Sequence, residues 1–473
     1  MMMSSTEKFE THSSGTLQPQ RGTRCVPRLL LYYNRSMQKR SKTILMVIPV
    51  AILLLGIVSM LPPVRSRLDD LQTRIRYALN PPDQAVFVPT QAQLDLAVTQ
   101  TLAALQATPT QLPDKTMSIT PTVTPNPLPA YISLPGVIYV DQHNRWNYCG
   151  PANLTMALNF WGWRGNRDDV AAVVKPGVND PSLDFIQRGK PDKNVMPYEM
   201  ADFVNEQTDL RALYRYGGNI DLLKQLLVAG FPTVVEKGYY ERDYTGKVAW
   251  LGHYLFVTGY DESQGGFIVQ DAWLEPGENI LSEYPVFIEG WRSFNYLFLI
   301  VYPPEREPEL LELLGPWADP AWARQHALDI ANQEIQNQTG IDQFFAWFNK
   351  GSSHVLLQQY NDAAFAFDYA FSLYAALGQD DLQRPYRIMW YQTGPYWAYF
   401  YTGRYQDVIN LANTTLYDTI SEPTLEESIY WRAMAEFALG DSANAYADMR
   451  QTVYLNPNFS PGWQMMSQWG IQP

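Results

Sequence analysis

The sequence predicts an α+β domain, in which a helix packs on an antiparallel sheet, followed by an all-α domain of helical repeats and preceded by a single transmembrane helix. Three observations carry this prediction. In residues 131–302 helical spacing comes early and strand-like runs come late. Residues 317–473 keep helical spacing throughout. Residues 44–61 (ILMVIPVAILLLGIVSML) run for 18 residues without a charge, just long enough to cross a bilayer.

Length and charge limit the classes of protein to consider. The chain has 473 residues, more than one ordinary domain, and 46% of them are hydrophobic, which is enough for packed cores. Residues 1–62 hold eight of the 35 basic and two of the 48 acidic residues, so the remainder carries a net charge of −19. Such an acidic body argues against nucleic acid as a partner, because phosphate binding needs a basic surface. Two cysteines are too few for a disulfide framework.

The first 130 residues divide by composition into three segments. Residues 1–42 form a polar, basic tail that we expect to be flexible. We interpret residues 43–62 as an uncleaved transmembrane anchor, since the leader is long for a signal peptide and no small-x-small site follows. Residues 63–130 form a spacer with one possible helix and a linker rich in Pro and Thr. Five basic residues before the apolar run and four after it favour a single-pass cell-membrane protein with its N-terminus in the cytoplasm and its globular domains outside.

Residues 131–302 form the first globular domain. The spacing of apolar residues and the positions of Gly and Pro predict both helices and strands there. We expect helices at 149–161, 168–174, 197–206 and 219–229, and strands at 137–140, 211–216, 232–236, 254–260, 267–271 and 296–302. The proline-rich stretch 303–308 marks a hinge before the second domain.

Cys149 stands where the first of these helices begins. Pro151 is tolerated there because the amide N–H it lacks has no partner in a first turn. Leu154 and Leu158 recur on one face of the helix, which we expect to be buried. A cysteine at a helix start meets the positive end of the helix dipole, which favours the reactive thiolate. The alternative is that Cys149 is only a small buried residue.

Two further side chains favour nucleophilic catalysis. His253 opens an apolar strand (GHYLFVTGYD) and Asp271 ends the next (FIVQDAW), so that in a hairpin centred near Ser263 the two side chains are paired or diagonal. A register shift of one residue places Asp271 on the other face, and the sequence leaves this open. Cys149 as nucleophile, His253 as base and Asp271 as orienting acid form an activated-nucleophile arrangement. Gln142 is either a second oxyanion donor or a loop-capping amide.

The motifs QHNRWNYCGPANLTMALNFWG, GHYLFVTGYD and FIVQDAW, in that order, resemble the papain-like cysteine peptidases related to the bacteriocin-processing, double-glycine leader peptidases. The resemblance covers about residues 131–302. It implies a papain-like fold with Cys149 as nucleophile, His253 as base, Asp271 as orienting acid and Gln142 as oxyanion residue. In place of the ATP-binding transporter module often fused to leader peptidases, this chain has the apolar segment and the helical repeats. No two histidines share a metal-ligand spacing, so we expect neither a metal nor a cofactor.

Residues 317–473 show internal repetition. Small and aromatic residues recur at helix-pair offsets and let antiparallel helices approach closely; they are Gly351, Ala363, Phe367 and Ala370 in one unit and Ala433, Gly440, Ala445 and Pro457 in another. The offsets resemble the tetratricopeptide repeat, which implies a short solenoid. The dense aromatic residues between Tyr386 and Tyr405 are either repeat core or the lining of a groove for a peptide.

Together these features support the hypothesis of a membrane-anchored cysteine peptidase that hydrolyses peptide bonds. Its repeats would recruit a peptide or protein substrate or a partner protein. Two alternatives stay open at this point. One is an amidase that acts on cell-wall peptides or small amides, and the other is a non-catalytic repeat scaffold with a relic peptidase domain.

Overall fold

The computed structural model describes residues 127–473 except 193, 243–247, 378–383, 421–422 and 473. The predicted tail (1–42), the predicted anchor (43–62) and nearly all of the spacer (63–130) therefore lie outside the described residues. Within the described part of the chain, no helix is both long and apolar enough to cross a membrane. The anchor stays a prediction.

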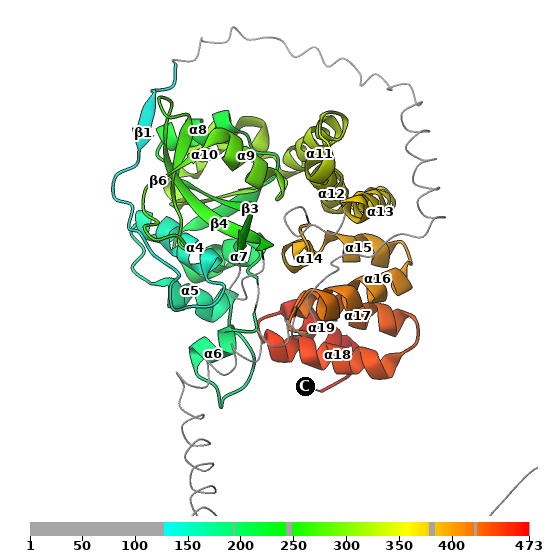
Figure 1. Ribbon diagram of the computed structural model, residues 1–473. Coiled ribbons are helices and arrows are strands. Elements are labelled where there is room, and N and C mark those ends of the chain that lie inside the picture. Colours follow the sequence, from blue (N-terminus) through cyan, green and yellow to red (C-terminus); the bar gives the residue numbers. More distant parts are fainter. Residues whose placement is uncertain (1–126, 193, 243–247, 378–383, 421–422, 473) are drawn as a thin grey trace, which may run out of the picture. The chain divides into compact units, whose positions relative to one another are not determined.

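A seven-stranded antiparallel sheet organises residues 131–302 (Figure 1). Its strands lie in the order β2-β7-β3-β4-β5-β6, and β1 pairs with β4. The strands are β1 (Tyr131–Ser133), β2 (Arg211–Arg215), β3 (Thr233–Arg242), β4 (Val248–Asp261), β5 (Gly266–Gln270), β6 (Ile280–Glu283) and β7 (Phe298–Tyr302).

Helices cover both faces of this sheet (Figure 1). Successive residues of each strand point to opposite faces of the sheet. Val234 and Phe256 therefore belong to the core beneath α4, whereas Val235 and Val257 belong to the core beneath α8. The α4 side carries α4 (Cys149–Phe160), α5 (Arg167–Val174) and α7 (Pro197–Gln207), and the other side carries α8 (Ile220–Val228), α9 (Tyr284–Arg292) and α10 (Glu307–Leu314). This is the helix-on-sheet α+β domain that the sequence predicts.

Most of the expected elements are present, with one clear error. The helix expected at 149–161 is confirmed as α4, and the other expected helices are confirmed as α5, α7 and α8. The strand expected at 137–140 is wrong. Tyr131–Ser133 pairs with β4 instead, and residues 137–140 lie outside any ladder, where the Tyr139 hydroxyl donates to the carbonyl of Asp271 at 2.9 Å. The sequence analysis also missed α6 (Phe185–Gly189), β6 and α9.

A bulge at Thr258 in β4 sets the register of the β4–β5 hairpin. On the turn side of the bulge the pairs follow a simple hairpin, and on the far side they are shifted by one residue. Extending the shifted ladder puts Leu255 opposite Asp271, and His253 diagonal to Asp271 on the same face of the sheet. The bulge is held from β5, because Gln270 Nε2 donates to Thr258 Oγ1 at 2.9 Å.

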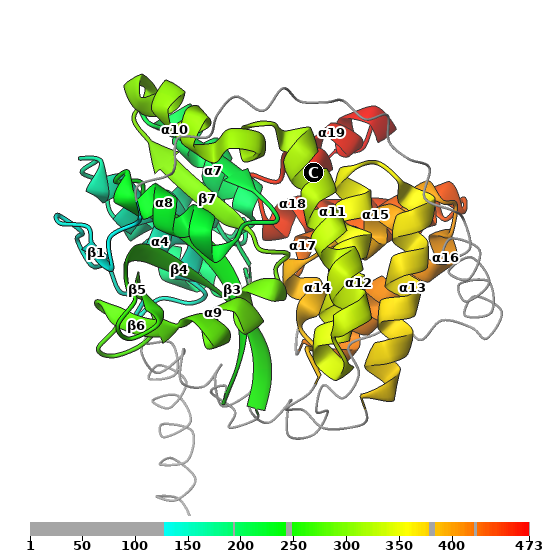
Figure 2. The ribbon, with the colours of Figure 1, turned by 90° about the horizontal axis from the view of Figure 1, so that it is seen from above.

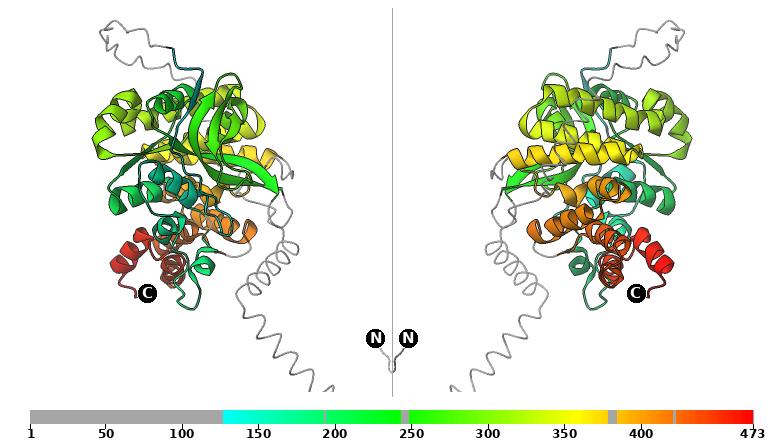
Figure 3. Two further views of the ribbon diagram at one scale, coloured as in Figure 1. Left: turned by 90° about the vertical axis from the view of Figure 1, so that its left-hand side faces the viewer. Right: turned by 90° about the vertical axis from the view of Figure 1, so that its right-hand side faces the viewer.

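Residues 304–472 are mainly helical and share a core with the sheet domain. One cluster of buried side chains includes Leu154 and Leu158 of α4 together with Phe344, Phe348 and Phe367 of the helical region. Figures 2 and 3 show the helices following one another from α11 to α19. They are α11 (Pro320–Asn337), α12 (Gly340–Leu356), α13 (Tyr360–Ala376), α14 (Ile388–Tyr391), α15 (Gly394–Tyr401), α16 (Tyr405–Asn413), α17 (Glu426–Ala438), α18 (Ser442–Leu455) and α19 (Ser460–Trp469), with short turns η1 (Pro304–Arg306), η2 (Gly315–Ala318) and η3 (Thr414–Asp418).

Helices α12 and α13 approach closely at one of the small residues that the sequence analysis singled out. A Cβ added to Gly351 would lie 2.6 Å from the Phe367 ring, closer than real Cβ atoms come to a neighbour. Glycine at this position therefore lets the two helices meet. The tetratricopeptide assignment itself stays a prediction.

Arg292, at the end of α9, joins the sheet domain to the helical region. Its guanidinium pairs with Glu334 of α11 at 2.9 Å and with Asp342 of α12 at 2.8 Å, and Arg292 is only 9% exposed. Removing one partner from a buried ion pair leaves an uncompensated charge, which typically costs about 3–5 kcal/mol. We therefore expect Arg292→Ala to lower the free energy of unfolding by roughly that amount, measured by urea denaturation of the full-length chain in detergent.

The matched control is Arg164→Ala, which removes an exposed arginine from the same domain. Surface substitutions usually change the free energy of unfolding by less than about 0.5 kcal/mol. Equal denaturation midpoints for Arg292→Ala and Arg164→Ala would contradict the buried ion-pair junction.

Candidate active site

Cys149 is the first residue of α4, and its side chain is half-buried. The backbone N–H groups of Gly150 and Tyr254 lie near its thiol and help to lower the pKa of Cys149. The buried side-chain amide of Asn153 donates to the carbonyl of Cys149 and to the carbonyl of Tyr254, both at 2.9 Å. These two hydrogen bonds from one amide fix the start of α4 to Tyr254, the strand residue that follows His253.

His253 and Asp271 meet through a hydrogen bond of 2.8 Å between Nε2 and Oδ1. His253 lies on β4 and is 4% exposed, and Asp271 directly follows β5. The backbone N–H of Trp273 also donates to Asp271 Oδ1, at 2.9 Å. Because Nε2 is bound to the carboxylate, Nδ1 is the ring nitrogen left for the hydrogen bond between His253 and Cys149. The three side chains thus lie in one row, in which His253 is hydrogen-bonded to Asp271 and shifts the pKa of Cys149.

The charges in this row move the pKa values in complementary directions. Burial by itself raises the pKa of Cys149, but the hydrogen bond and charge of His253 outweigh it, so the pKa is lowered. Burial by itself lowers the pKa of His253, but Asp271 and Cys149 outweigh it and raise the pKa to about 10. Burial by itself raises the pKa of Asp271, but the charge and hydrogen bond of His253 outweigh it and keep the pKa of Asp271 below its ordinary value. Near neutral pH this favours thiolate, imidazolium and carboxylate together.

Gln142 lies in the irregular segment before α4 and is 8% exposed. Its backbone N–H donates to the carbonyl of Ala272 at 2.8 Å, next to Asp271. Its side-chain Oε1 is buried and accepts no hydrogen bond from a described residue. The amide oxygen can only accept, so a hydrogen bond to an oxyanion would have to come from Nε2 of the same side chain.

Arg167 of α5 holds the two residues on either side of Gln142. Its guanidinium donates to the carbonyl of Asp141, to the Asp141 carboxylate at 2.9 Å and to the carbonyl of His143 at 3.0 Å. The ring Nε2 of His143 bonds in turn to the carbonyl of Trp273 at 2.9 Å. These contacts fasten the segment that carries Gln142 to the loop after β5.

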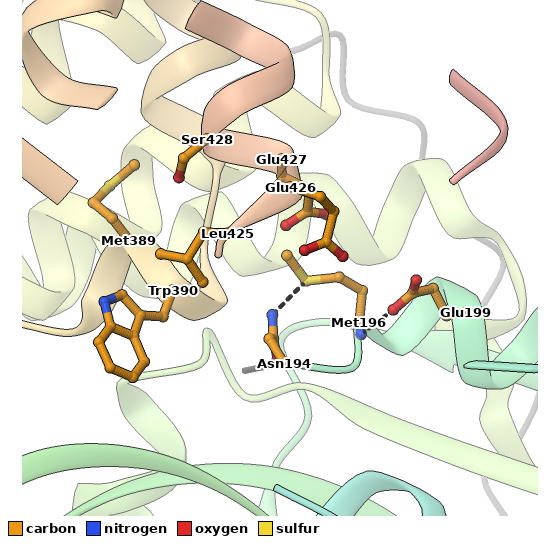
Figure 4. Close-up of a pocket in the computed structure, with 9 residues that line it drawn as sticks. All are labelled: Asn194, Met196, Glu199, Met389, Trp390, Leu425, Glu426, Glu427 and Ser428. Carbon is orange, nitrogen blue, oxygen red and sulfur yellow. Dashed lines mark hydrogen bonds between the residues drawn. The ribbon is translucent and has the colours of Figure 1, made fainter. Parts of the chain in front are cut away.

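Two cavities in the described part of the chain lie outside this row. One of about 380 Å³ runs along the Gln142 segment, and its lining includes Arg145 and Arg167. The other, of about 10 Å³, is large enough for about one water molecule and lies between the loop before α7 and the start of α17, lined by Glu199, Glu426 and Glu427 among others (Figure 4). Among the described residues, no group of three or more His, Cys, Asp or Glu is arranged to hold a metal ion.

The sequence analysis missed several residues that support the row. Asn153 was detectable as a polar residue on an apolar helix face, four residues after Cys149. Glu236 was detectable as an acid within the apolar strand β3, where it lies opposite Tyr254 and is 3% exposed. Burial raises the pKa of Glu236 well above its ordinary value. The Tyr254 hydroxyl donates to the carbonyl of Val195 at 2.9 Å.

Comparison with known proteins bears on this part of the chain. No curated protein matches it. One similar solved structure is a putative C39-like peptidase from Bacillus anthracis, with 16% identity, coverage of 36% of this chain and 96% of that chain, and a TM-score of 0.28. Another is Xylellain, a cysteine protease from Xylella fastidiosa, with 17% identity, coverage of 37% and 87%, and a TM-score of 0.25. Similarity at this level is not evidence about the site.

A model of the Peptidase_C39 like family matches residues 135–297. This range includes Gln142, Cys149, His253 and Asp271, and it leaves the helical region outside the match. The family resemblance drawn from the sequence motifs is thereby confirmed. Residues 135–297 are thus similar to the Peptidase_C39 like family, and this similarity identifies the chain as a cysteine peptidase.

Proposed function

We propose that the chain hydrolyses peptide bonds with Cys149 as nucleophile, His253 as general base and acid, and Asp271 as the group that orients His253. The observation that carries the proposal is the hydrogen bond of 2.8 Å from His253 Nε2 to Asp271, which leaves the other ring nitrogen for the Cys149 thiol, whose pKa His253 lowers. The pKa shifts support the same roles, because a thiolate beside an imidazolium is the form that attacks carbonyl groups.

The reaction then follows in two halves. The Cys149 thiolate adds to the carbonyl carbon of the scissile bond, and the carbonyl oxygen becomes an oxyanion. As the C–N bond breaks, the His253 imidazolium gives its proton to the leaving amine, and a thioester to Cys149 remains. His253 next takes a proton from a water molecule, whose oxygen adds to the thioester carbonyl. Loss of the thiolate releases the carboxylic acid and restores the starting charges.

Gln142 is proposed as a donor to the oxyanion, together with the backbone N–H of Cys149. Support comes from the hydrogen bond that ties Gln142 to Ala272, next to Asp271, and from the contacts by which Arg167 holds Asp141 and His143. A donor fixed in advance stabilises the transition state because it needs no reorganisation when the charge forms.

The proposal also includes the location of the enzyme and the role of its helical region. The uncharged run and basic flanks of residues 43–62 support a membrane anchor, with the peptidase domain on the extracytoplasmic side. The helices of residues 317–473, which share a core with the peptidase domain, support recruitment of a peptide or protein substrate or partner.

The direct test replaces the nucleophile. The experiment uses the full chain carrying Cys25→Ser, so that Cys149 is the only thiol. We expect the peptidase activity to be found in the membrane fraction. We also expect iodoacetamide to label Cys149 faster than it labels free cysteine below pH 7. Cys149→Ala should lower hydrolysis by at least about 10³-fold, as loss of a triad nucleophile does. Unchanged hydrolysis in Cys149→Ala would rule out the proposed nucleophile, and activity in the soluble fraction alone would rule out the anchor.

The pH dependence tests the role of Asp271. Its carboxylate raises the pKa of His253, so wild-type activity should fall on the alkaline side near pH 10, where the imidazolium loses its proton. Asp271→Asn removes that charge, so the pKa of His253 falls and the alkaline limb of kcat/KM should move to lower pH, with a loss at the optimum on the order of 10²-fold. Asp209→Asn, an exposed carboxylate before β2, is the control. An alkaline limb that stays in place would contradict the orienting role.

A double-mutant cycle tests Gln142 and Arg167. We expect Gln142→Ala to lower kcat by about 10²–10³-fold, the usual effect of losing one oxyanion donor. Arg167→Ala should lower kcat in wild-type background but have little further effect on Gln142→Ala, because Arg167 acts only by holding Gln142. The rate of Cys149 alkylation should stay unchanged in both.

Arg145→Ala is the matched control for Arg167→Ala. Arg145 lines the same cavity and its side chain pairs with Asp168, but it makes no side-chain bond to Asp141 or His143. Effects of Gln142→Ala and Arg167→Ala that multiply in the double variant would show that Arg167 acts by another route.

A further inference from the structure

We infer that Tyr391, at the end of α14, lines the substrate cleft beside Cys149 and helps to select the peptide bound there. Tyr391 lies outside residues 135–297, the part of the chain that matches the peptidase family. The inference rests on the proposed function and adds a specificity residue from the helical region to it.

The strand that carries His253 has an open edge next to the nucleophile. On one edge, β3 pairs with β4 along its length from Val248 to Val257. On the other edge, β5 reaches only as far as Phe256. In the described part of the chain, no strand therefore pairs with this second edge between Val248 and Leu255. Every second N–H and carbonyl there points away from β3.

Two N–H groups on this edge face side chains from other elements. The N–H of Tyr254 lies near the Cys149 thiol and the N–H of Gly252 near the Tyr391 hydroxyl, and each helps to lower the pKa of the group it faces. Alternate residues of a strand present their N–H groups to the same edge, and two residues span about 7 Å. The thiol and the Tyr391 hydroxyl therefore lie along one edge of β4, roughly 7 Å apart in the strand direction.

The ring of Tyr391 is fixed in place by the sheet domain. It meets Trp250 edge-on at 5.7 Å and Phe294 at 6.0 Å between ring centroids. A Cβ at Gly252 would lie 2.8 Å from Tyr391 Cδ1, so the ring packs directly on that glycine. The next residue, Gln392, donates to the carbonyl of Ser293 at 2.6 Å. The side chain remains half-buried, so part of it is open to a bound peptide.

A second tyrosine lies on the other side of the catalytic histidine. Tyr239 of β3 meets the His253 ring edge-on at 5.6 Å, and it lies close enough to Cys149 and Tyr391 to interact with both electrostatically. A peptide that reaches Cys149 would thus pass between one tyrosine from the sheet domain and one from the helical region.

The chemistry of Tyr391 indicates what it recognises. Its hydroxyl lies near the N–H of Gly252 and can accept from that group. A tyrosine hydroxyl can donate and accept at once, so it can also donate its proton to a main-chain carbonyl of an extended peptide. The exposed part of the ring offers an apolar face to the side chain beside that carbonyl. We therefore assign Tyr391 to main-chain binding and to selection of an apolar side chain near the scissile bond.

The kinetic test uses the full-length chain carrying Cys25→Ser and a peptide library. Tyr391→Phe keeps the packing but removes the proton, so KM should rise several-fold with kcat within about twofold. Tyr391→Ala should also relax the preference for an apolar residue at one position next to the cleaved bond. Tyr401→Ala, which removes a tyrosine that is 53% exposed in the neighbouring helix α15, should change neither. Kinetic constants and library profiles equal to wild type in both Tyr391 variants would overturn the inference.

A second measurement does not depend on hydrolysis. Cys149 is alkylated with iodoacetamide and with a bulky fluorescein maleimide, and the ratio of the two rates is compared between variants. Tyr391→Ala should raise the relative rate of the bulky reagent at least threefold, whereas Tyr401→Ala should leave it unchanged. An unchanged ratio in Tyr391→Ala would overturn the placement of Tyr391 at the cleft. If the wild-type protein cleaves no peptide while Tyr391→Ala still shows the changed ratio, the proposed function is contradicted and the placement of Tyr391 is not.

Discussion

The hydrogen bond between His253 and Asp271 depends on the bulge at Thr258. Side chains alternate along a strand, so a hairpin without the bulge would place His253 and Asp271 on opposite faces of the sheet. Gln270 stabilises both sides of this arrangement, since its amide donates to Thr258 at 2.9 Å and to Asn279 at 2.8 Å. One buried side chain thus holds the bulge and the loop that follows Asp271, and with them the geometry of the site.

The charges of the site depend on one another in the same way. A buried ionised group is costly unless it is paired, and each member of the row from Cys149 through His253 to Asp271 is opposed by its own burial. The imidazolium is stable only between the two anions, so removing either one changes the protonation of the rest. In the proposed reaction Asp271 touches no substrate atom, yet through His253 it would set the pH range in which Cys149 is a thiolate.

The sequence predicted the candidate residues better than their geometry. Cys149, His253 and Asp271 could be identified because Cys149 begins a helix, His253 precedes an apolar run within a strand and Asp271 directly follows a strand. The register could not be predicted, because a threonine such as Thr258 is ordinary in a strand and gives no sign of a bulge. Contacts between distant segments could not be predicted either. Arg167 reaches back to the Gln142 segment only after the chain has folded, and local periodicity carries no record of that contact.

The helical region packs on the sheet domain and helps to bury its residues, so the two do not form independent domains. Trp250 lies on β4, three residues before His253, and is 1% exposed because Phe294 stacks on it at 5.6 Å and Phe345 of α12 meets it at 5.8 Å. Without the helices, this tryptophan and the edge of β4 beside Cys149 would face water, at a substantial cost in buried apolar area. The proposed recruitment by the helices and the proposed catalysis by the sheet domain would therefore be coupled physically. A peptide held near Tyr391, as proposed, would already be at the strand edge beside Cys149.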